Sequence, residues 1–106
     1  MSTEYHGHRT AGGLAHVVTP EGSELPPRND LRDHSPTGFE WGYAGSGPLQ
    51  LGLALLAHSQ ANDELALEHY KDFTRMVVAS LPEREWRLST EEIAEALTAI
   101  RAMRGN

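Results

Sequence analysis

Side chains that could do chemistry are concentrated in residues 34–48, which read HSPTGFEWGYAGSGP. The carboxylate of Glu40 lies there between two aromatic residues, Phe39 and Trp41, and Tyr43 follows after one glycine. Aromatic rings can stack on a nucleobase or another planar ligand. A carboxylate can accept a hydrogen bond, pair with an arginine or act as a general base. The alternative is that the aromatic residues belong to a sheet core and that the carboxylate forms a structural salt bridge.

A glycine turn, Gly45-Ser46-Gly47-Pro48, leads from this stretch into the most apolar segment of the chain. Ser46 is predicted to be a helix N-cap, and Pro48 suits the first helical turn. Backbone N–H groups in such a turn form a nest that favours a phosphate or carboxylate. The turn is neither a P-loop nor a dinucleotide-binding fingerprint, because the lysine and the glycine spacing of those motifs are missing. A strand-to-helix turn that only caps the helix is the alternative.

His34 lies in the same stretch, and its ring could act as an acid or base near neutral pH. Together with Glu40 it would give a small hydrolase two titratable groups, provided that both side chains point into one cleft. The alternative role for His34 is structural, with its ring holding a loop by hydrogen bonds. Ser35 and Ser46 lack the surroundings of a nucleophile elbow, so serine hydrolysis is not expected.

Cationic residues and histidines outside this stretch add two further possibilities. Arg9, Arg28 and Arg32 could converge on an anion, and Arg9 or Arg32 could pair with Glu40. Three histidines could share one face of a hairpin and would be acceptable zinc ligands: His6, His8 and His16. We nevertheless predict no metal site and name no cofactor, since short N-terminal strands often carry exposed histidines.

The remaining pattern predicts the elements that position these residues. Residues 1–10 and 14–19 are typical of a β-hairpin around an Ala-Gly-Gly turn, a proline-rich loop follows, and residues 39–41 are expected to form a short strand. Three helices with one extended segment before the last complete the chain: Ser46 to about His58, Asn62 or Asp63 to Leu81, Glu85–Leu88 extended, and Ser89, with Glu92 in a capping box, to Gly105. The expected fold is α+β, with a small antiparallel β-sheet from the N-terminal half packed against about three α-helices.

Composition limits the classes of function. A chain of 106 residues is expected to be a single domain, residues 1–106. The absence of cysteine excludes disulfides, thiolate metal sites and cysteine nucleophiles. The net charge of −6 disfavours general attraction to nucleic acid. Neither a signal peptide nor an apolar run of about 20 residues is present, so we expect a soluble, cytoplasmic protein without membrane contact.

The stretch from His34 to Pro48, continued by Leu49-Gln50-Leu51, resembles the hallmark of a family of small proteins of unknown function. In that family the pattern over these positions usually reads HSPxGFEWGYGGSGPAQL, so this chain departs from it at Ala44 and Leu49. The resemblance extends over most of the chain through further segments: Tyr5-x-Gly7-x-Arg9, Asp30-Leu31, Tyr70-x-x-Phe73, Val77-Val78 and Trp86-x-Leu88. Members of the family that this stretch resembles occur in bacteria, archaea and phages. The resemblance supports the fold and the location of the site, and it implies no particular activity.

These observations predict a binding or interaction module that holds a small anionic ligand, such as a nucleotide, or an acidic group of a protein partner. The expected ligand-binding residues are Arg9, Glu40, Trp41, Tyr43, Gly45, Ser46 and Gly47. By analogy with phage members, an accessory role in phage–host conflict is the expected context. The alternatives are a small hydrolase that uses His34 and Glu40, and a protein–protein interaction module. The apolar stripes of the last two helices also leave a homodimer open.

Overall fold

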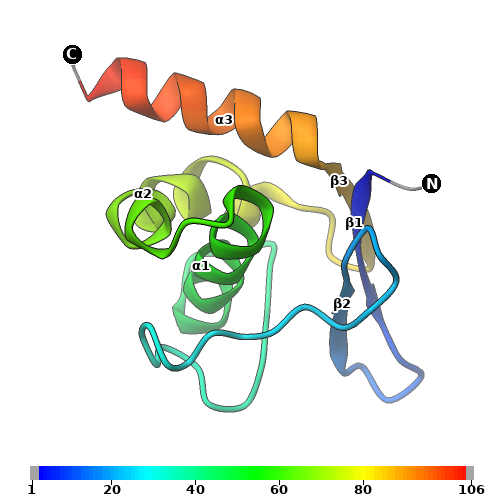
Figure 1. Cartoon of the computed structure of the whole chain (residues 1–106). Coiled ribbons are helices and arrows are strands. Elements are labelled where there is room, and N and C mark those ends of the chain that lie inside the picture. Colours follow the sequence, from blue (N-terminus) through cyan, green and yellow to red (C-terminus); the bar gives the residue numbers. More distant parts are fainter. Residues whose placement is uncertain (1–2, 105–106) are drawn as a thin grey trace.

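The computed structural model describes residues 3–104 and has an α+β fold. In Figure 1 the sheet lies on the right and α1 and α2 lie on the left, with α3 crossing above them. The elements in chain order are β1 (Glu4–Arg9), β2 (Ala15–Val18), α1 (Ser46–Gln60), α2 (Asp63–Met76), the 3-10 helix η1 (Val78–Ser80), β3 (Glu85–Ser89) and α3 (Thr90–Met103).

The sheet contains three antiparallel strands in the order β2-β1-β3. β1 and β2 form the predicted hairpin, in which His8 pairs with His16. On its other edge β1 pairs with β3, which places Gly7 opposite Trp86. The fold class is therefore confirmed, but one strand comes from the C-terminal half of the chain. That strand joins the sheet because its alternating apolar residues, Trp86 and Leu88, are buried against the core.

The predicted strand at residues 39–41 is wrong, because residues 38–45 form no regular element. Gly38 and Gly42 on its two sides have φ angles of 124° and 84°, which interrupt an extended backbone. Both edges of β1 are already paired, so this segment has no place beside the first strand. It packs instead near η1, where the N–H of Gly42 donates to the carbonyl of Val78.

The inner face of the sheet follows the two-residue period of β1. Tyr5 and Gly7 are buried, and Arg9 lies on the same side of the strand. A Cβ atom on Gly7 would lie 2.1 Å from the indole ring of Trp86. The absence of a side chain at Gly7 therefore lets the indole ring of Trp86 approach the backbone of β1 closely.

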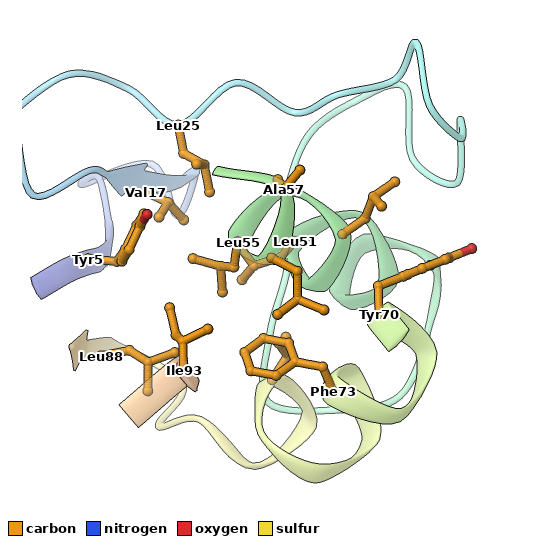
Figure 2. Close-up of a cluster of buried hydrophobic side chains, with 14 of the residues drawn as sticks. Tyr5, Val17, Leu25, Leu51, Leu55, Ala57, Tyr70, Phe73, Leu88 and Ile93 are labelled. Carbon is orange, nitrogen blue, oxygen red and sulfur yellow. The ribbon is translucent and has the colours of Figure 1, made fainter. Parts of the chain in front are cut away.

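The central helix is α1, as predicted. Apart from Leu49, every residue of α1 from Gly47 to Ala57 is buried. Figure 2 shows Leu51 and Leu55 of this helix between Tyr5 and Val17 of the sheet and Phe73 of α2. A helix that is buried on all sides forms the core of a small α+β fold.

The other helices begin where their capping residues predicted. Asn62 caps α2 by accepting from the N–H of Leu65, and Ser89 caps α3 in the expected capping box with Glu92. α2 ends at Met76 and not at Leu81, because η1 takes up the following residues. The predicted end of α3 at Gly105 lies outside the described residues. Among residues 3–104, none of the helices has the length and apolar character needed to span a membrane.

Candidate functional site

A cavity of about 500 Å³ opens beside residues 40–43. Residues from four parts of the chain line it, and four of them are predicted ligand-binding residues. The lining consists of Arg9, Gly13, Glu40, Trp41, Gly42, Tyr43, Leu81 and Glu83. The end of β1, the hairpin turn, the irregular segment and the loop before β3 thus meet at one place. The structure brings together Arg9, Glu40, Trp41 and Tyr43, as the sequence predicted.

The Arg9 guanidinium is held on three sides. Its Nη2 donates to Oε1 of Glu40 at 2.9 Å, and its Nη1 reaches Oε2 at 3.3 Å. Its Nε donates to the carbonyl of Glu83 at 2.9 Å, and the group lies 4.5 Å above the ring of Trp41. Of the predicted partners for Glu40, the structure therefore selects Arg9. These contacts fix both the position and the plane of the guanidinium.

Trp41 forms the floor of the cavity and is not an open stacking platform. Its ring is 1% exposed, its Nε1 donates to the carbonyl of Glu83 at 2.8 Å, and it meets Trp86 edge to face. Tyr43, in contrast, is 51% exposed at the rim. Of the three aromatic residues in the predicted stretch, Phe39 is half-buried against the core, and only Tyr43 is exposed to solvent.

The glycine turn lies next to the cavity but does not line it. Gly45 and not Ser46 is the N-cap residue, and no side chain caps α1, so the predicted role of Ser46 is wrong. Gly45 has an extended backbone that takes the chain directly into the helix. A Cβ atom on Gly47 would lie 2.7 Å from Cβ of Glu40. Gly47 therefore permits close contact between the helix N-terminus and the Glu40 side chain, which is a packing role.

His34 and Glu40 have different partners. The Nε2 of His34 lies 2.6 Å from the hydroxyl of Tyr70 on α2, whereas Glu40 binds Arg9. His34 is also absent from the lining of the cavity. The geometry therefore favours the structural role for His34, in which its ring holds the loop by a hydrogen bond. His34 and Glu40 do not form the acid–base pair that a hydrolase would need.

The loop that carries the site is fixed by Gln50, a residue to which sequence reasoning assigned no role. Gln50 is fully buried in α1. Its Oε1 accepts from the N–H groups of His34 and Ser35, and its Nε2 donates to the carbonyl of Pro27. The sequence feature that could have indicated this role is a single amide side chain within an apolar stretch. A buried amide needs hydrogen-bond partners, and here a loop supplies them.

The other arginines do not reach the cavity. Arg28 pairs with Asp30 and with Asp63 at the start of α2. Hydrogen bonds from Arg28 hold the pKa of both carboxyl groups below their usual value, and the same bonds raise the pKa of Arg28. Arg32 donates to the carbonyl of Leu31. The predicted convergence of three arginines is therefore reduced to Arg9 alone.

The three N-terminal histidines share the outer face of the sheet, as their spacing suggested. The ring of His8 stacks between those of His6 and His16, with centroid distances of 5.2 and 5.8 Å. Nε2 of His6 lies 2.5 Å from Oε2 of Glu85, and this contact lowers the pKa of Glu85. Stacked rings do not point at a common centre. Within residues 3–104, no group of three potential ligands is arranged to hold a metal ion.

A second cavity, of about 510 Å³, lies between α2 and α3. Its lining mixes carboxylates and guanidinium groups from the helix surfaces: Asn62, Glu64, Leu65, Glu68, His69, Arg101 and Arg104. Only His69 is buried among them, and Arg104 binds Asp72. The cavity at Arg9 is preferred as the candidate site because it contains a guanidinium fixed by hydrogen bonds and four of the predicted ligand-binding residues.

Comparison with known proteins gives one match. A model for a family of unknown function, DUF6166, matches residues 5–99. The chain belongs to DUF6166. The matched range includes all residues of the cavity and ends within α3. No curated protein and no solved structure matches the chain. The family match therefore covers the candidate site and assigns it no activity.

Proposed function

We propose that this chain is a cytoplasmic binding module that holds a small anionic ligand with a planar part, such as a nucleotide, in the cavity at Arg9. The observation that carries the proposal is the Arg9 guanidinium, fixed on Trp41 at the floor of an open cavity with the exposed ring of Tyr43 at the rim. A fixed cation and an exposed aromatic ring are the two groups that such a ligand requires.

The chemistry of the cavity supports this ligand class. A guanidinium has five N–H groups, and three of those on Arg9 are used in hydrogen bonds within residues 3–104. The other two N–H groups make no hydrogen bond among these residues. Tyr43 offers a flat surface for a base, and the backbone at Gly42 adds no side chain that would narrow the cavity. We infer a biological context in phage–host conflict, in which the module sequesters a nucleotide signal; this step rests on analogy.

A thermal-shift titration with adenosine and guanosine monophosphates and inorganic phosphate tests the proposal. A ligand present at 100 times its dissociation constant adds about 2.7 kcal/mol to the free energy of unfolding. For a domain of this size the midpoint should rise by roughly 10 °C. Tyr43→Ala should weaken nucleotide binding by about 1–3 kcal/mol, because base stacking is lost.

Met103→Ala is the matched control, since Met103 is exposed on α3 and does not line the cavity. It should leave nucleotide binding unchanged. If no nucleotide shifts the midpoint at millimolar concentration, the small-ligand function is wrong.

An interaction module for a protein partner is the second candidate. Leu14, next to Gly13 at the cavity, is 67% exposed, and Tyr43 is also exposed. Exposed apolar side chains near a cavity with an arginine are typical of partner contacts. In this case an acidic peptide group would reach Arg9, and nucleotides would give no shift in the titration.

A further inference from the structure

Arg9 and Glu40 form an ion pair within the candidate site. The cation that would hold an anionic ligand already binds a carboxylate of its own chain, through both terminal nitrogens. We propose that the Glu40 carboxylate occupies the anion-binding position at Arg9 while no ligand is bound. A carboxylate or phosphate of the ligand then displaces Glu40 from Arg9. This inference rests on the proposed function and adds the anion subsite and its competitor.

Arg9 does not need Glu40 to keep its orientation. Its Nε donates to the carbonyl of Glu83, and its guanidinium lies on the buried ring of Trp41. Trp41 is held by its burial, by its edge-to-face contact with Trp86 and by its bond to the carbonyl of Glu83. The two terminal nitrogens therefore stay directed at the same place when Glu40 leaves. They offer the parallel N–H groups that a carboxylate or phosphate accepts in a bidentate manner.

Glu40 is held much less firmly than Arg9. Its side chain is 37% exposed against 21% for Arg9, and its carboxylate has no other hydrogen-bond partner among residues 3–104. Its Cβ atom abuts Gly47, so the backbone end is fixed while the carboxylate end can rotate toward solvent. A partly exposed ion pair contributes little to stability. Displacement of Glu40 therefore opposes ligand binding only weakly.

The internal carboxylate also explains how an acidic chain could select its ligand. Net charge is −6, so an isolated anion gains little from the electrostatic field of the whole chain. Only a group that matches the guanidinium in geometry and also contacts Tyr43 competes well with Glu40. This competition makes the site selective for ligands with an oxyanion and a planar part.

The test measures binding of inorganic phosphate, acetate and adenosine monophosphate to Glu40→Gln by calorimetry. Glutamine keeps the Cβ and Cγ atoms that pack on Gly47 but loses the charge that binds Arg9. If Arg9 is free in about one molecule in ten, removal of the competitor raises phosphate affinity about tenfold. Comparison of phosphate with acetate shows which oxyanion the subsite prefers.

Glu95→Gln is the matched control, because Glu95 is exposed on α3 and does not line the cavity, yet its replacement removes the same charge from the chain. Its loss should change affinity by about twofold or less. Arg9→Gln should abolish the gain in a Glu40→Gln background. Equal gains in both acidic variants would mean a field effect and would overturn the displacement.

A measurement on the unaltered protein keeps the inference testable if a variant fails to fold. On saturation with adenosine monophosphate, the side-chain carboxyl carbon resonance of Glu40 should move to the position of a free glutamate, while the Nε–H of Arg9 stays protected. Tighter binding to unaltered protein than to Glu40→Gln would make Glu40 a direct ligand contact; the displacement would then be wrong and the proposed function would stand. Absence of binding in every form would refute both.

Discussion

The amide of Gln50 shows how one residue determines the shape of a distant site. It bonds three backbone groups of the loop between Pro27 and Ser35, and this loop continues into the segment with Glu40 and Trp41. Buried backbone N–H groups that lose their acceptor are costly. Gln50 is therefore the residue through which the central helix holds the loop.

Replacement of Gln50 by leucine should lower the free energy of unfolding by about 2–4 kcal/mol, because two N–H groups and one carbonyl lose their partner. Urea denaturation measures this loss. Gln60→Leu at the end of α1 is the matched control, since Gln60 bonds only Ser59, and it should change stability by about 0.5 kcal/mol or less. A loss below about 1 kcal/mol for Gln50→Leu would show that water replaces the amide and that the loop is held by other contacts.

For individual residues, the sequence predicted which residues meet at the candidate site better than it predicted what each of them does there. It left Arg9 and Arg32 open as partners of Glu40, and the structure forms the pair with Arg9. It could not tell that Trp41 is buried while Tyr43 is exposed, because this depends on where η1 and β3 pack. The cap predicted at Ser46 is absent because Gly45 already turns the chain into the helix.

At the scale of elements, the contact between α1 and α2 depends on Gly52. A Cβ atom there would lie 2.0 Å from Oγ1 of Thr74, whose hydroxyl bonds the carbonyl of Tyr70. Gly52→Ala should therefore destabilise the protein by about 1–2 kcal/mol, although alanine favours a helix by about 1 kcal/mol. In a Thr74→Ala background this loss should disappear. The four forms make a double-mutant cycle that chemical denaturation can measure.

Gly12→Ala provides the reference for this cycle, because Gly12 has no positive φ angle and its nearest contact would be at 4.0 Å. It should be neutral within about 0.5 kcal/mol. Equal destabilisation by Gly52→Ala with threonine or alanine at position 74 would mean that the helix backbones, and not the Thr74 side chain, limit the contact.

Elements were predictable where the deciding residues are neighbours in the chain. The caps of α2 and α3 each depend on residues three positions apart, Asn62 with Leu65 and Ser89 with Glu92. The sequence predicted the capping box of α3 and placed the cap of α2 at Asn62 or Asp63. Pairing of β3 with β1 joins residues about 80 positions apart, so no local pattern indicates it. The strand expected at residues 39–41 is absent for the same reason, since β2 and β3 already pair with both edges of β1.

At the scale of the whole molecule, Tyr5 joins the sheet to the central helix. Its ring is 1% exposed, and its hydroxyl lies 2.6 Å from Nδ1 of His58 at the end of α1. Burial, with a smaller effect from the charge of Glu21, raises the pKa of Tyr5 from 10.0 to about 12. A phenolate is therefore disfavoured at the interface on which the whole fold depends.

This shift predicts a loss of stability at alkaline pH. Between pH 10 and 12 the unfolded chain loses the Tyr5 proton while the folded protein keeps it, so the free energy of unfolding falls as pH rises. Two pKa units correspond to about 3 kcal/mol, which is fully present below pH 10 and is lost by pH 12. Denaturation at a series of pH values measures the slope, and Tyr5→Phe should remove this contribution because it has no proton to lose. If the free energy of unfolding falls equally with pH in both proteins, other groups cause the alkaline transition. The contact between the sheet and α1 would then tolerate a phenolate at position 5.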